Sequence, residues 1–220
     1  MFRSRSRAII IPQSEHLKLA GTLALLWGNA DFDLPPTDRS SLVLGVGQHD
    51  RGYGYLDNSP VGEMPEDEWF GIARKGFSMP CSDVVGDLIV KYHFIRLANY
   101  SQTIKRQALT REFKQEAQQV LEAHGLSPEL FARIDRITDL LDSISVAFCK
   151  DQPVDGQVPV HAINGRDELV NVNYKVEAGE IRANPWPFSV DSYSGYILGY
   201  KRDGYPAITD PVILPFKLVK

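Results

Sequence analysis

The segment from residue 127 to residue 149 is the strongest constraint on the fold, because it reads as a long helix that other parts of the chain must enclose. Ser127 is a good N-cap, Pro128 suits the first helical position and Glu129 lies in the first turn. The later part, LLDSISVAFC, has one charged residue, Asp142. A helix that is apolar on nearly every side is a buried helix. The remaining elements must therefore cover it.

Five further helices are predicted upstream, where apolar residues recur at helical spacing. In the first, at about 14–27, Leu19, Leu23 and Trp27 share a face with His16, and Ser14 is a suitable N-cap. The others are expected at 40–49, 66–77, 82–98 and 103–124. Glycines and prolines between 50 and 65 prevent a long regular element, so this stretch is expected to be an extended connection that could line a site.

The texture of the sequence changes after Lys150. Helical spacing gives way to short alternating runs, VNVNYKVE, YSGYILGYK and VILPFKLVK, separated by turn-forming residues. One more strand is expected near the N-terminus, at 8–11. We therefore predict a mainly α protein in which residues 1–150 form a helical domain. Residues 151–220 are expected to form a small C-terminal antiparallel β appendage packed on it.

The composition argues against several classes of protein. Of the 220 residues, 43% are apolar and 24% are charged, which is typical of a globular chain. A net charge of -4 gives no basic surplus for nucleic acid, although a small anionic substrate can still bind locally. No run approaches the roughly 18 apolar residues of a membrane span, and Cys81 and Cys149 lack zinc-finger spacing. We expect a soluble, cytoplasmic protein, with no membrane partner, that could form a homodimer.

Five metal-binding side chains fall at positions where a plain core would place apolar residues. They are His16, His49, Asp50, His93 and Asp142. A single histidine on an apolar face is more often a hydrogen-bonded core residue than a ligand. Asp142 is more informative, because burying a carboxylate costs several kcal/mol (about 3–5) unless it is paired or bound to metal.

Imidazoles and carboxylates without thiolates favour Fe, Mn, Co or Zn in a catalytic site that keeps open positions. We predict one tightly bound divalent ion and allow a second. Glu68, in the acidic run PEDEW, is a candidate additional ligand, although acids at a helix start are equally well explained by the helix dipole. Arg51, Tyr53 and Arg96 are candidate substrate contacts, with solvated surface or simple packing as the alternative.

The order of these residues resembles the HD superfamily of metal-dependent phosphohydrolases. In that superfamily a His, then a His-Asp pair, then a distant Asp supply the ligands from helices, and HDRGY at 49–53 is similar to its HD-x-G-K run. Tyr53 stands where that run has a lysine that often assists a phosphorylated substrate. The resemblance implies an HD-like helical bundle for residues 1–150.

A second resemblance covers nearly the whole chain. The segments QSEHLKLAGTLALLWGN, GQHDRGYGYLDNSP, the His93 helix, LLDSISVAFC and NPWPF are similar, in this order, to a bacterial family known as domain of unknown function 3891. This family brings no established activity. It supports the fold and the site more than the function.

These observations lead to three hypotheses. The first is a metal-dependent hydrolase acting on a phosphoester or nucleotide, in which Asp50 and His93 are catalytic and a metal-activated water attacks phosphorus. The second is a di-iron oxygenase of the HD type, to which the resemblance assigns six ligands where this chain offers five. The third is a non-catalytic protein that binds a metal or another ligand.

Overall fold

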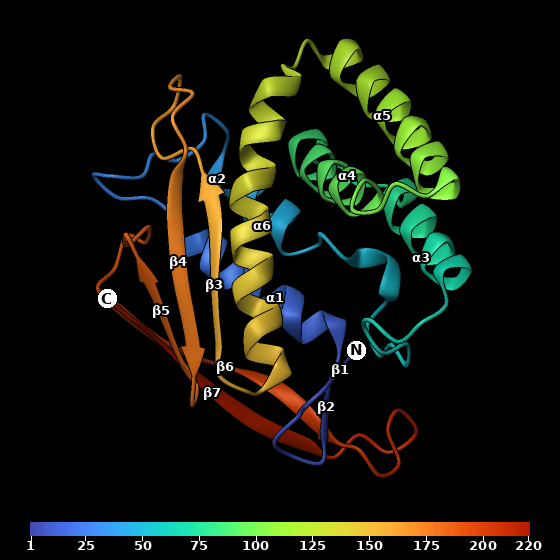
Figure 1. Cartoon of the computed structure of the whole chain (residues 1–220), viewed down its shortest axis with the longest axis vertical. Coiled ribbons are helices and arrows are strands. Elements are labelled where there is room, and N and C mark those ends of the chain that lie inside the picture. The colour runs from blue at the N-terminus through green and yellow to red at the C-terminus, as the bar shows by residue number, and fades with distance from the viewer.

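The computed structural model describes residues 1–220 as six α-helices, one short 3-10 helix and a seven-stranded sheet (Figure 1). The helices are α1 (Gln13–Leu26), α2 (Arg39–Val46), η1 (Arg51–Tyr53), α3 (Glu66–Ser78), α4 (Val84–Ala98), α5 (Ile104–His124) and α6 (Pro128–Lys150). The strands are β1 (Phe2–Arg3), β2 (Ile9–Ile11), β3 (Val154–Val160), β4 (Val170–Glu177), β5 (Glu180–Asn184), β6 (Ser192–Lys201) and β7 (Pro211–Val219).

The sheet joins strands from both ends of the chain. Its order is β1-β2-β6-β7-β5-β4-β3, and all neighbours are antiparallel except β5 and β7. The N-terminal strand β2 pairs with β6, with Ile9 opposite Lys201. The long pairing of β6 with β7 forms the middle of the sheet. The result is a mixed, curled sheet.

Helix α6 lies at the centre of the molecule, between the sheet and the other helices. It packs against β3 and β4 on one side and against α1 and α4 on the other, and the sheet curls around it (Figure 1). Its side chains Phe131, Leu140, Leu141 and Ile144 are fully buried. The helix is therefore buried, as its sequence predicts, and strands form much of the structure that covers it.

The predicted fold class is wrong. The β-rich part is not a small appendage on a helical bundle, because one large hydrophobic core contains side chains of α1, α6 and the strands together, such as Leu23, Ile144, Val172 and Leu218. Local alternation revealed individual strands. It could not reveal that β2 pairs with β6 or that β5 lies parallel to β7, since both pairings join distant segments.

The helix boundaries agree with the sequence to within a few residues, with two differences that affect the site. Pro12, and not Ser14, holds the N-cap position of α1. The Asp57 side chain accepts a hydrogen bond from the backbone N–H of Gln13 at 2.9 Å. Helix α2 ends at Val46, so His49 lies in the turn that follows it. Because His49 and Asp50 lie outside the helix, their side chains are not held about 100° apart by helical geometry.

A second, smaller core fixes α3 against α4 and α5. It includes Ala73, Phe94 and Phe77, whose ring stacks on Phe113 with centroids 4.0 Å apart. The backbone of η1 also approaches α3 closely, because a Cβ on Gly52 would lie 2.2 Å from the carbonyl oxygen of Ile72. Only glycine fits at that contact. None of the helices combines the length and the apolarity that crossing a membrane requires.

Candidate metal centre

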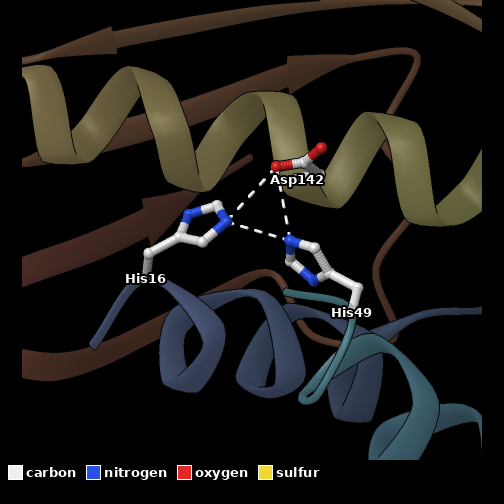
Figure 2. A group of neighbouring side chains, drawn as sticks. All are labelled: His16, His49 and Asp142. Atoms are coloured by element: carbon white, nitrogen blue, oxygen red, sulfur yellow. Dashed lines mark hydrogen bonds and ion pairs between the residues drawn. The ribbon is translucent and has the colours of Figure 1, made fainter. Parts of the chain in front are cut away.

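Three side chains from distant parts of the chain converge between α1 and α6. His16 lies in the second turn of α1, His49 in the turn after α2, and Asp142 in the middle of α6 (Figure 2). The Nε2 atoms of the two histidines are 2.9 Å apart. Asp142 Oδ1 lies 3.3 Å from the first and 3.4 Å from the second. All three atoms therefore share one small space.

This triangle has the size that a bound transition metal requires. Ligand atoms about 2.1 Å from one ion stand about 3.0 Å apart at right angles and about 3.4 Å apart at the tetrahedral angle. The observed separations of 2.9, 3.3 and 3.4 Å match those values. The three residues thus fit one metal ion, with its remaining positions available to other ligands.

The outer nitrogens of both histidines are held by hydrogen bonds. His49 Nδ1 lies 2.6 Å from the carbonyl oxygen of Val46, so this nitrogen must be the donor. His16 Nδ1 lies 2.8 Å from Ser145 Oγ, and this hydroxyl donates to the carbonyl oxygen of Asp142 at 3.0 Å. His16 Nδ1 is therefore a donor too. Such partners are typical of metal-binding histidines.

These hydrogen bonds leave two imidazole lone pairs and a carboxylate oxygen facing one another. A cation or a proton must lie between them, since three acceptors so close repel each other. Burial disfavours a charged His49, but the charges on Asp142 and Asp50, together with the hydrogen bonds to Asp142 and to the Val46 carbonyl oxygen, outweigh it and raise the pKa of His49. Burial likewise opposes a charged Asp142, yet His49 and the hydrogen bond with His16 hold the pKa of Asp142 well below its usual range. The centre is electrostatically prepared for positive charge.

Asp50 and His93 form the adjoining part of the site. His93 Nε2 lies 3.2 Å from Asp50 Oδ1, and Gln13 Nε2 donates to Asp50 Oδ2 at 3.2 Å. One potential ligand atom from each of His49, Asp50 and His93 also lies within 4.8 Å of the other two. The structure therefore brings all five predicted ligands together, in two overlapping groups.

His93 differs from His16 and His49 in having no nitrogen lone pair left for a metal ion. Arg96 Nη2 lies 2.9 Å from His93 Nδ1, and a guanidinium can only donate, so this nitrogen accepts. Nε2 of a neutral His93 then carries the proton and donates it to Asp50. Burial and the neighbouring charge on His49 lower the pKa of His93 to about 4, which keeps the ring neutral. His93 is thus arranged to hold Asp50 in place, whereas His16 and His49 present free lone pairs.

Arg96 lies behind the site and is surrounded by carboxylates of α6. Its guanidinium is 3.2 Å from Asp135, 2.7 Å from Asp139 and 3.5 Å from Asp142. Burial raises the pKa of Asp135 to about 6 despite this arginine. The three carboxylates neutralise the charge of Arg96, which positions His93 and Asp142. Arg96 does not line the pocket that opens onto the centre.

A pocket of about 410 Å³ opens onto the centre. Asp50, His93 and Asp142 lie in its wall, whereas His16 and His49 are fully buried behind them. The rest of the lining is mostly apolar or aromatic: Phe2, Tyr53, Val61, Met64, Trp69, Leu97 and Val146, together with Gly62 and with Gln13, Glu66 and Arg106 as the polar members. A small molecule can therefore reach Asp142 and Asp50 directly.

Gln13, Trp69 and Arg106 are among the pocket residues that were not identified from the sequence. Arg106 lies over the Trp69 ring, 4.3 Å from its centroid, and hydrogen-bonds Glu66 at 2.7 Å. Gln13 is 1% exposed, and its Oε1 has no hydrogen-bond partner. Gln13 precedes His16 by almost one helical turn, which is the one local signal that could have indicated it. Trp69 and Arg106 reach the pocket through tertiary packing alone.

The other predicted residues lie in different surroundings. Tyr53 lines the pocket, and burial and the charge on Asp50 raise the pKa of its hydroxyl, so that it stays protonated. Arg51 is buried away from the pocket, where it donates to the Gly76 carbonyl at 2.6 Å and to Asp87 at 2.7 Å. Glu68 contacts Ser59 and is not in either group of ligands.

A protein-family model described as "Protein of unknown function (DUF3891)" matches residues 1–66 and 85–198. All five side chains of the two ligand groups lie within the matched ranges, whereas Trp69 and most of α3 lie outside them. No curated protein and no solved structure matches the chain.

Proposed function

The chain belongs to the family of unknown function DUF3891, and from the geometry of its buried centre we propose that it is a metal-dependent hydrolase acting on a phosphoester. The convergence of His16, His49 and Asp142 at ligand separations carries this proposal. The pocket beside them supplies the space for a substrate. The order of these residues along the chain resembles that of HD phosphohydrolases, although the curled sheet departs from the helical bundle expected for them.

His16, His49 and Asp142 are the residues that would hold the ion. Two imidazoles and one carboxylate suit Fe, Mn, Co or Zn. When bound, such an ion lowers the pKa of a water molecule toward neutrality and so provides hydroxide for attack on phosphorus. A second ion near Asp50 would require His93 to lose the proton or the Arg96 hydrogen bond that fixes its ring. We therefore propose one tightly bound ion.

The remaining residues have separate roles in this proposal. Hydrolysis joins the water oxygen to phosphorus and breaks the ester P–O bond. Asp50, held by His93 and Gln13, would accept the proton that the attacking water loses and return it to the leaving oxygen. Tyr53 stays protonated and can donate a hydrogen bond to a substrate oxygen. His93 is a positioning residue.

Metal analysis combined with an activity screen tests this proposal. Gently purified protein is analysed for metals, reloaded with Mn, Fe, Co, Zn or Mg, and assayed on a panel of phosphoesters, beside His49→Ala. His124→Ala is the matched control, because His124 is exposed at the end of α5. We expect about one ion per chain and phosphoester turnover, both lost in His49→Ala and both kept in the control.

Other results would contradict the proposal. Absence of turnover with every metal, in protein that binds one ion, would favour a non-catalytic metal-binding protein. Two irons per chain with a redox-active spectrum would favour the di-iron oxygenase. Equal metal content in His49→Ala and the parent would show that His16, His49 and Asp142 do not form the metal site.

A further inference from the structure

The walls of the pocket are suited to an apolar group. Seven of the lining residues are apolar or aromatic, and Trp69, Tyr53 and Phe2 supply rings from three separate segments. The Trp69 ring is already covered on one face by Arg106. Aromatic side chains recognise flat apolar groups by stacking and by the area they remove from water. This part of the pocket is built for a substrate's uncharged portion.

The charges around the pocket leave no surplus for a polyanion. Asp50 and Asp142 together balance a divalent ion, and Arg106 is paired with Glu66 at 2.7 Å. Arg51 and Arg96, the other arginines near the ligands, do not line the pocket and are held by carboxylates. A substrate with several negative charges would therefore carry uncompensated charge in this pocket.

Apart from the Tyr53 hydroxyl, the polar groups away from the centre offer few free donors, because Arg106 already donates through Nε to Glu66 and through Nη1 to the Leu97 carbonyl oxygen. Gln13 donates through Nε2 to Asp50, which fixes its amide and leaves the unpartnered Oε1 buried beside the pocket. Glu66 presents a carboxylate. Acceptor atoms repel phosphate oxygens and attract N–H or O–H groups. A second phosphate would find few donors here.

We infer that the pocket accepts a singly charged phosphoester with an aromatic or apolar group and rejects polyphosphates. This inference rests on the proposed function, because the charge balance includes the ion. A phosphodiester has one negative charge and two organic groups, so it meets both requirements. Nucleoside polyphosphates carry an aromatic base but have several negative charges, so they fail the charge requirement.

Binding of three stable phosphorus compounds to the metal-loaded protein tests this inference without any need for turnover. Diphenylphosphinate has one charge and two rings, dimethylphosphinate has one charge and no ring, and methylenediphosphonate is a polyanion. We expect isothermal titration to give diphenylphosphinate at least about tenfold tighter binding than dimethylphosphinate. Methylenediphosphonate should bind no more tightly than dimethylphosphinate. Protein recovered after each titration is analysed for metal, because the diphosphonate chelates.

Variants locate the preference at the pocket. Trp69→Leu should reduce the preference for diphenylphosphinate by at least about threefold, and Trp69→Phe should keep most of it. Tyr100→Leu is the matched control, because Tyr100 is 89% exposed. Circular dichroism melts check that each variant is folded. If Trp69→Leu fails to fold, the three compounds on the parent protein decide the question.

The two proposals can fail separately. Equal binding of the two phosphinates, or tightest binding of methylenediphosphonate to protein that keeps its metal, would overturn the inference and leave the hydrolase intact. A preference for diphenylphosphinate in protein that hydrolyses no phosphoester with any metal would overturn the function and leave the pocket's selectivity.

Discussion

The two sides of the site are built in different ways. On the ligand side, His16, His49 and Asp142 project from elements of the large core, and their outer hydrogen bonds fix which atoms face the centre. On the pocket side, α3 rests on the small core, and its Trp69 meets Arg106 of α5. The first side is suited to holding an ion in one geometry. The second supplies aromatic and apolar surface for a substrate.

Asp142→Ala should break the ligand side most severely. The substitution removes one of the three converging atoms and the charge that balances the ion. We expect affinity for Mn or Co to fall by more than about 100-fold, since even outer hydrogen-bond partners are worth about 10- to 100-fold. Competition with a chromophoric chelator measures it. Asp139→Asn, on the same helix and outside the ligand groups, is the control; an equal loss there would mean that general electrostatics dominates.

Ser145→Ala should weaken the same side by a smaller amount. It removes the hydroxyl that fixes His16 Nδ1 and leaves a fully buried nitrogen without its partner. Metal affinity should fall about tenfold in the same competition assay. Ser143→Ala, two residues away and less buried, should leave it unchanged. If the Ser145 variant keeps full affinity, the assigned His16 tautomer is incorrect.

His93→Gln separates the two groups of candidate ligands. Glutamine can still donate to Asp50 and accept from Arg96, so we expect metal affinity to change by less than about threefold. Turnover should fall, because the flexible glutamine side chain holds Asp50 less rigidly than the buried imidazole ring does. Chelator competition and the rate of phosphoester hydrolysis are measured on one preparation. A loss of metal as large as that in His49→Ala would make His93 a ligand.

Phe77→Leu should affect the pocket side alone. Phe77 is fully buried and stacks on Phe113, so its loss is expected to lower the free energy of unfolding by about 1 kcal/mol. Metal affinity should stay within experimental error, while diphenylphosphinate binds a few-fold more weakly. Phe131→Leu, in the large core, should cost similar stability without weakening that ligand. Loss of metal in Phe77→Leu would show that the two sides are not independent.

The same contrast explains what the sequence could predict. A carboxylate in LLDSISVAFC and a histidine on an apolar helix face are locally conspicuous, and the structure places these residues together. Trp69 and Arg106 are ordinary residues of amphipathic surface helices in the sequence. They reach the pocket only because the small core brings α3 to α4 and α5, which no local pattern encodes.

The fold shows the same limit. Helix ends follow from local signals such as Ser127 before Pro128 and Gly125, whose φ of 62° suits glycine, and they were predicted within a few residues. The pairing of β2 with β6 and of β5 with β7 depends on contacts between distant segments, and the predicted bundle with a small appendage was therefore wrong. His93 presents an intermediate case. Its presence in the site was predicted, whereas the role that Arg96 gives it required the geometry.

Anomalous diffraction from crystals grown with cobalt or manganese tests the metal centre most directly. We predict one strong peak, about 2.1 Å from His16 Nε2, His49 Nε2 and Asp142 Oδ1, with an open side toward the pocket. Metal-loaded crystals with no peak between these atoms, or with the side chains of His49 and Asp142 turned away from each other, would contradict it.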